Sequence, residues 1–152
     1  LMNDTILNNI LFNNVTKLND DDYDRINHII DLVELKDFID DQEDGLNTII
    51  GERGKTISGG QRQRISLARA IFRDPKIIIL DEATNAIDEK TEIKIYENLI
   101  QLKKNITLLI STHKSSIVEK SNNILLFENL NVRQFASWKD YAKKNDIFIK
   151  SL

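Results

Sequence analysis

The sequence of 152 residues contains no cysteine, which excludes disulfides and cysteine-ligated metal sites and fits a reducing compartment. It also lacks long hydrophobic runs: the longest aliphatic stretches, residues 77–80 and 124–127, are far too short to span a bilayer. The net charge of −3 gives no global indication of binding to nucleic acid or to an anionic membrane. No signal peptide is visible and the chain begins with Leu1 rather than Met, so we expect a piece of a longer protein.

The composition, 41% hydrophobic and 30% charged, is ordinary for one soluble domain with a hydrophobic core. Asp4 and Thr5 are capping residues before a short predicted helix. An amphipathic helix with an acidic first turn is predicted from Asp20, and the acidic stretch 20–44 is interpreted as a solvated helical face. Residues 45–60 hold all five glycines and predict a loop.

Helices and strands alternate in the rest of the chain. A helix capped by Ser58 is predicted to stop at Asp74 and Pro75, and the aliphatic run "KIIIL" that follows is typical of a strand covered on both faces of a parallel sheet. The further predicted elements are a helix over about 89–102, a strand "ITLLI", a short helix after Thr112, a strand "NNILLF" and a helical tail over 137–152. This alternation predicts an α/β layered fold.

The letters G-K-T at residues 54–56 end the pattern of a phosphate-binding P-loop, G-x-x-x-x-G-K-[ST]. The first glycine of that pattern would fall at position 49, which is Ile49. The stretch that follows is "ISGG" rather than a helix-forming run. We therefore interpret Lys55 as an exposed loop lysine and not as part of a P-loop.

The stretch "SGGQ", residues 58–61, opens a predicted helix. Its two glycines leave backbone N–H groups unshielded, beside the Ser58 hydroxyl and at the positive end of the helix dipole. Such a turn can bind an anion, and the alternative is a glycine turn with a serine N-cap.

Two carboxylates, Asp81 and Glu82, directly follow the predicted strand "IIIL". Ligands of open α/β sheets bind beyond the carboxyl ends of the strands. Asp81 suits the oxygen shell of Mg²⁺, and Glu82 suits a general base or a group that positions water. The alternative is a pair of acids that caps the next element.

Asp88 and His113 lie further along the chain. Asp88 by itself predicts an N-cap for the following helix. His113 ends a second buried strand, where its side chain would point into the same crevice as Glu82; the alternative is a packing or capping histidine.

These features together resemble the nucleotide-binding domain of ABC transporters. The run "ISGGQRQRISLARAIFRDPKIIILDEATNAID", followed by "STH", is similar to the family's LSGGQ signature, Walker B strand, D-loop and H-loop, in that order and at similar spacing. "IIGERG" resembles the x-loop of ABC exporters, and "LMNDTILNNILF" resembles the segment after their Q-loop. Departures from the family pattern are Asn85 in the D-loop, where Ser is usual, and Ala136, Ser137 and Trp138 in the tail.

The resemblance implies a P-loop NTPase-like α/β fold, with a parallel sheet core flanked by helices and an α-helical subdomain. Residues 1–73 would form the helical subdomain with the x-loop and signature helix, and residues 74–152 the second half of the ATPase core. The family's Walker A motif, A-loop aromatic and Q-loop glutamine are not in this sequence, and we expect them upstream of Leu1.

The resemblance also implies ATP binding and hydrolysis with Mg²⁺ at a head-to-tail dimer of two such domains, homo- or heteromeric. The dimer would lie on the cytoplasmic face of a membrane and power an exporter. The residues that would hold the γ-phosphate of the partner domain's ATP are Ser58, Gly59, Gly60 and Gln61.

The remaining roles implied by the resemblance fall on single residues. Asp81 would support Mg²⁺ through water, Glu82 would polarise the attacking water, and His113 would contact the γ-phosphate. Asp88 would link the two sites across the dimer. The x-loop pair, Glu52 and Arg53, would lie near the transmembrane domain, and the alternative for it is an exposed loop ion pair.

Two other functions compete with transport. ABC-type ATPases also act on nucleic acid and on ribosomes, and the arginines of the signature helix could be read as a basic stripe: Arg62, Arg64, Arg69 and Arg73. The net acidic chain and the exporter-like motifs favour transport, so we expect no nucleic-acid partner. The other alternative is an isolated fragment that is catalytically inert because it has no Walker A motif.

Overall fold

The computed structural model describes residues 1–12, 18–51, 56–81, 86–101 and 106–144. The chain divides into two compact units, Leu1–Ser111 and Thr112–Leu152. The subdomain boundary expected near residues 73 and 74 falls inside the first unit and stays a prediction. Glu52, Arg53 and Glu82 lie outside the described residues.

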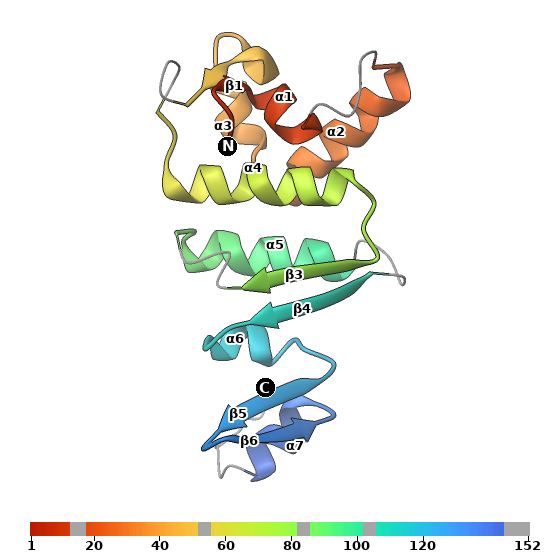
Figure 1. The fold of residues 1–152 in the computed structure, drawn as a ribbon, viewed down its shortest axis with the longest axis vertical. Helices are drawn as coiled ribbons and strands as arrows, with labels where there is room; N and C mark the ends of the chain where they lie inside the picture. The colour runs from red at the N-terminus through yellow and green to blue at the C-terminus, as the bar shows by residue number, and fades with distance from the viewer. Residues whose placement is uncertain (13–17, 52–55, 82–85, 102–105, 145–152) are drawn as a thin grey trace. The chain divides into compact units, whose positions relative to one another are not determined.

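The first unit combines helices with short strands (Figure 1). Its elements are β1 (Asp4–Thr5), α1 (Ile6–Leu11), α2 (Asp20–Leu32), α3 (Lys36–Asp40), the 3₁₀ turn η1 (Gly45–Asn47), β2 (Ile49–Ile50), α4 (Gly59–Phe72), β3 (Ile77–Asp81), α5 (Glu89–Gln101) and β4 (Thr107–Ser111). The loop predicted over residues 45–60 is interrupted by η1 and β2. A strand forms there because Ile50 is fully buried and β2 pairs antiparallel with β1.

Capping side chains set where the helices begin. The Thr5 hydroxyl accepts a hydrogen bond from the Asn8 N–H at 3.0 Å, as predicted for the start of α1. Asn19 caps α2 through reciprocal hydrogen bonds with Asp22. The predicted stop of α4 before Pro75 is confirmed, since the helix ends at Phe72.

The hydrophobic core of the helical part lies between α1, α2 and α4, which pack together. Its fully buried aliphatic side chains, at 0 to 1% exposure, are Ile6, Ile10, Ile26 and Ile65. The apolar residues recur on one face of each helix, which is the pattern that predicted them.

One polar residue, Asn9 of α1, is fully buried within this core. Its Nδ2 donates to the carbonyls of Met2 and Thr5, both at 3.0 Å. Its Oδ1 accepts from the Met2 N–H at 2.8 Å and from Arg69 Nη2 at 3.1 Å. Asn9 therefore connects the start of the chain to α4, a role that no periodic pattern in the sequence predicts.

β3 and β4 form a parallel pair, as predicted. The paired residues are Ile77–Thr107, Ile78–Leu108, Ile79–Leu109, Leu80–Ile110 and Asp81–Ser111. Ile78 and Leu80 are buried, whereas Ile77 and Ile79 are 57% and 70% exposed. The expectation of cover on both faces is thus not met by the described residues, which bury the alternate side chains of one face only.

The second unit contains a β-hairpin and two short helices (Figure 1). Its elements are α6 (Ser115–Val118), β5 (Ile124–Glu128), β6 (Asn131–Phe135) and α7 (Trp138–Lys144). The turn residues Asn129 and Leu130 have φ of 48° and 61°, which a tight two-residue hairpin turn requires. Tyr141 of α7 packs edge-on against Phe135 of β6, with ring centroids 5.2 Å apart.

Replacing Asn9 with alanine should lower the free energy of unfolding by about 2–4 kcal/mol, because it leaves the buried hydrogen-bond partners of Asn9 unsatisfied. Asn8→Ala is the matched control: the side chain of Asn8 is exposed and donates a hydrogen bond to Asp4 Oδ1 at 2.8 Å. The Asn8→Ala substitution should lower the free energy of unfolding by less than about 1 kcal/mol. Urea unfolding of both variants measures the difference, and equal midpoints would contradict the structural role of Asn9.

Candidate functional site

The first turn of α4 carries the predicted anion-binding stretch, and its local structure is a reciprocal capping box. Ser58 is the N-cap, with φ −64° and ψ 162°. Its hydroxyl oxygen accepts a hydrogen bond from the Gln61 N–H at 3.1 Å, and Gln61 Oε1 accepts one from the Ser58 N–H at 2.8 Å. The predicted serine cap is therefore confirmed, and it fixes the backbone of the turn.

This capping leaves hydrogen-bond donors for a ligand. The Arg62 N–H donates to the Ser58 carbonyl at 3.0 Å, and the Gln61 N–H is taken by the Ser58 side chain. The N–H groups of Gly59 and Gly60 have no acceptor within the described residues. The Ser58 hydroxyl uses only a lone pair in the box, so its hydrogen stays available to an anion at the positive end of the helix.

Both glycines of the turn lie against Ala86, in the segment that precedes α5. A Cβ on Gly60 would come 2.7 Å from the Ala86 carbonyl oxygen, and a Cβ on Gly59 would come 3.0 Å from the Ala86 Cβ. The Ala86 N–H donates to Gln63 Oε1 at 3.2 Å. The glycines are therefore needed for the close approach of the two segments, as well as for access to N–H groups.

Asp88 caps α5 and is exposed. Its Oδ1 accepts a hydrogen bond from the Thr91 N–H at 3.0 Å. This bond, with help from the Thr91 side chain and from the positive charge of Arg64, holds the pKa of Asp88 below its usual value. The carboxylate is thus ionised at neutral pH, and the N-cap role does not prevent its exposed side from meeting another molecule.

Asp81 ends β3 and is exposed, opposite Ser111 of β4. Because parallel strands end at the same edge, ligands of the sheet would meet this edge. The described residues include no group of three or more His, Cys, Asp or Glu side chains that could hold a metal ion. One exposed carboxylate fits Mg²⁺ held mainly by phosphate oxygens and water rather than by a cage of protein ligands.

His113 follows β4 by two residues, is exposed and belongs to the second unit. The residue with which it was expected to share a crevice, Glu82, lies outside the described residues, as does the x-loop pair Glu52 and Arg53. The roles of these four residues stay predictions.

Two of the four arginines that could form a basic stripe, Arg64 and Arg69, are half-buried and bonded within the protein, whereas Arg62 and Arg73 are exposed. Arg64 donates to the Glu34 carbonyl, and Arg69 Nε donates to the Asn9 carbonyl at 2.7 Å. The guanidinium groups of Arg69 and Arg73 lie 4.7 and 5.5 Å from the centre of the Phe12 ring. Burial lowers the pKa of both Arg64 and Arg69, as expected for packed rather than solvated cations.

Two residues that position the site were not singled out from the sequence. Gln63 and Ala86 hold the two motifs together, but a side-chain contact over 23 residues leaves no local pattern. The sequence feature that could have pointed to them is their place in the chain, since each lies close to a candidate motif.

Comparison with known proteins decides the family. A family model described as "ABC transporter" matches residues 3–85, which is more than half of the chain. The chain belongs to the ABC transporter family. The match covers the signature stretch and extends past Asp81 at the end of β3.

Relatives among curated ABC proteins are exporters and flippases. The chain is 40% identical over 150 residues to an ATP-dependent lipid A-core flippase of Vibrio parahaemolyticus, covering 97% of this chain and 25% of that protein. It is 42% identical over 129 residues to the flippase of that name in Escherichia coli K12, covering 85% of this chain and 22% of that protein. A putative export ATP-binding/permease protein of Rickettsia felis is 39% identical over 144 residues. The chain thus spans about a quarter of the length of these relatives.

A solved structure of the same family supports the fold. The chain aligns with a bacterial Atm1-family ABC exporter with ATP bound at a TM-score of 0.81 and 29% identity, covering 95% of this chain and 25% of that one. The α/β ABC ATPase fold is therefore shown. Within the described ranges, no helix has the length and apolar character needed to cross a membrane.

Gly60→Ala should destabilise the protein, although alanine normally stabilises a helix relative to glycine by about 0.5–1 kcal/mol. The added Cβ would force the Ala86 carbonyl away, at an expected cost of about 1–3 kcal/mol. Thermal or urea unfolding shows directly whether the substitution raises or lowers the stability. A Gly60→Ala variant more stable than the wild type would contradict the close contact between α4 and Ala86.

Proposed function

We propose that this chain is the C-terminal part of the nucleotide-binding domain of an ABC exporter, and that the whole protein hydrolyses ATP to power export across a membrane. The observation that carries this proposal is the first turn of α4, where a capped backbone presents two N–H groups without an acceptor among the described residues, and a hydroxyl, beside the segment 86–88. Membership of the ABC transporter family and the exporter relatives support it.

Residues 58–61 would contact the γ-phosphate of an ATP molecule bound to a second nucleotide-binding domain. The backbone N–H groups at a helix start are suited to a multiply charged anion, because they donate directionally and add no side-chain entropy cost. By the resemblance to ABC nucleotide-binding domains, this phosphate contact would be a contribution to the nucleotide site of the partner domain.

The hydrolytic step would depend on the acidic edge beyond β3. Mg²⁺, when bound, neutralises charge that develops on the phosphate oxygens. Asp81 would orient its water shell, and Glu82 would position the attacking water and draw its proton. His113 would donate to the γ-phosphate, and Asp88 would link the two sites of the dimer.

The membrane partner is the transmembrane domain of the exporter, and the ATPase part would lie on its cytoplasmic face. Glu52 and Arg53 would contact that domain. Arg64 and Arg69 donate to backbone carbonyls of this protein, which disfavours the rival function on nucleic acid. A stripe that binds nucleic-acid phosphates needs exposed cations.

A mixed dimer of two inactive variants tests the shared site. In the full-length protein as a homodimer, Ser58→Arg damages the signature and Glu82→Gln removes the water-positioning carboxylate, so each variant alone should hydrolyse ATP roughly 10²-fold more slowly than the wild type. A mixed dimer, purified through two different tags, regains one complete site of two and should recover about half of the wild-type rate.

The control is each variant purified with the same two tags, which should stay inactive. Mixed dimers as inactive as their parents would show that residues 58–61 and Glu82 act in the same site of one chain, and would contradict the proposal.

A further inference from the structure

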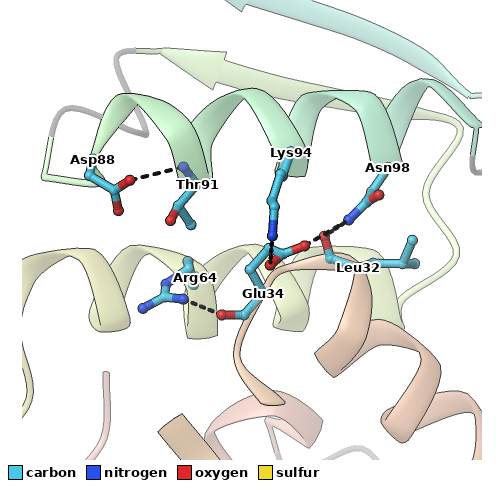
Figure 2. A network of polar contacts seen from close by, with 7 residues as sticks. All are labelled: Leu32, Glu34, Arg64, Asp88, Thr91, Lys94 and Asn98. Atoms are coloured by element: carbon cyan, nitrogen blue, oxygen red, sulfur yellow. Dashed lines mark hydrogen bonds and ion pairs between the residues drawn. The ribbon is translucent and has the colours of Figure 1, made fainter. Parts of the chain in front are cut away.

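Glu34, two residues after α2, joins the end of this helix to both α4 and α5 (Figure 2). Its backbone carbonyl accepts a hydrogen bond from Arg64 Nη1 of α4. Its carboxylate accepts from Lys94 Nζ at 3.3 Å and from Asn98 Nδ2 at 3.5 Å, both on α5. Asn98 also donates to the Leu32 carbonyl at 3.1 Å, so two carbonyls near the end of α2 are satisfied by side chains from other helices.

The backbone of Glu34 is in a conformation that favours glycine. Its φ is 55°, in the left-handed region, where a side chain with a Cβ is strained. The ion pair with Lys94 does little to offset this strain, since the two side chains are 30% and 54% exposed and water screens such pairs. A glycine would adopt this backbone conformation with less strain. The presence of glutamate is therefore explained by the contacts of its side chain with α5.

The two helices that Glu34 connects are the ones that begin at the candidate motifs. α4 starts with the turn of residues 58–61, and α5 starts directly after Asp88. Arg64 also directs its Nε at the Gly60 carbonyl, 3.4 Å away, and its charge attracts Asp88. Figure 2 shows the carboxylate of Glu34 directed at α5 while its carbonyl faces Arg64 on α4.

We propose that Glu34 is a positioning residue that, together with the Gly60–Ala86 contact, fixes the spacing between the signature turn and Asp88, the two motifs that would meet the partner's nucleotide. Its carboxylate contacts α5 and its carbonyl contacts α4, so loss of the carboxylate weakens the link to α5, which the Asn98–Leu32 hydrogen bond then carries. The inference rests on the proposed function. It adds a residue outside the signature, D-loop and Walker B motifs to the machinery of the shared site.

Glu34→Gly in the full-length protein separates positioning from stability. It relieves the left-handed backbone, so the melting temperature should not fall. It removes the two contacts that the Glu34 carboxylate makes with α5, so kcat for ATP hydrolysis should fall about fivefold or more, because small misplacements of positioning groups lower the rate of the chemical step. KM for ATP should change less than about twofold, because the residue lies outside the site that binds the nucleotide in the ground state.

Two further variants sharpen the test. Glu34→Gln keeps an oxygen acceptor for Lys94 and Asn98 and should retain most of the wild-type kcat. Asn129→Gly relieves another exposed left-handed residue, in the β5–β6 turn, and should leave kcat unchanged.

Three outcomes would overturn the inference: a Glu34→Gly kcat equal to that of the wild type, an equal loss in Glu34→Gln, or a loss that follows a lowered melting temperature. A wild-type protein that hydrolyses no ATP would instead overturn the proposed function, and the inference with it. An active wild type with an unaffected Glu34→Gly variant would overturn the inference alone.

Discussion

The approach of the Ala86 carbonyl to the first turn of α4 is the contact on which the rest of the candidate site depends. It is available only because Gly60 has no Cβ, since an ideal Cβ there would lie 2.7 Å from that oxygen. Gln63 adds a hydrogen bond to the N–H of the same alanine. The first turn of α4 and the residue Asp88 are thereby held side by side, although about thirty residues separate them in the chain.

The polar side chains around this contact serve mainly to join helices. Arg64 and Arg69 donate to backbone carbonyls of Glu34 and Asn9, so these two positive charges of α4 are used within the protein, whereas Arg62 is exposed. Asn9 in turn fixes the start of the chain against the same helix. α4 is consequently attached through Arg64 and Arg69 to the segments before it.

Local signals predicted the helices well and the tertiary contacts poorly. Thr5 and Ser58 were predicted as caps, and both are, because capping depends on residues only three positions apart. The aliphatic run of β3 predicted a parallel strand but not that Ile77 and Ile79 are exposed, since a run of this kind does not record which face is covered. The partners of Glu34 and Gly60 could not be predicted, because packing between distant segments chooses them.

The central claim is that the turn of residues 58–61 contacts ATP held by a second domain. A structure of the full-length protein with Mg²⁺ and a non-hydrolysable ATP analogue tests it most directly. The account predicts that the Ser58 hydroxyl and the Gly60 N–H lie within about 3 Å of γ-phosphate oxygens of a nucleotide whose other phosphates are bound by the partner subunit. A γ-phosphate bound by one chain alone, with residues 58–61 facing solvent, would contradict it.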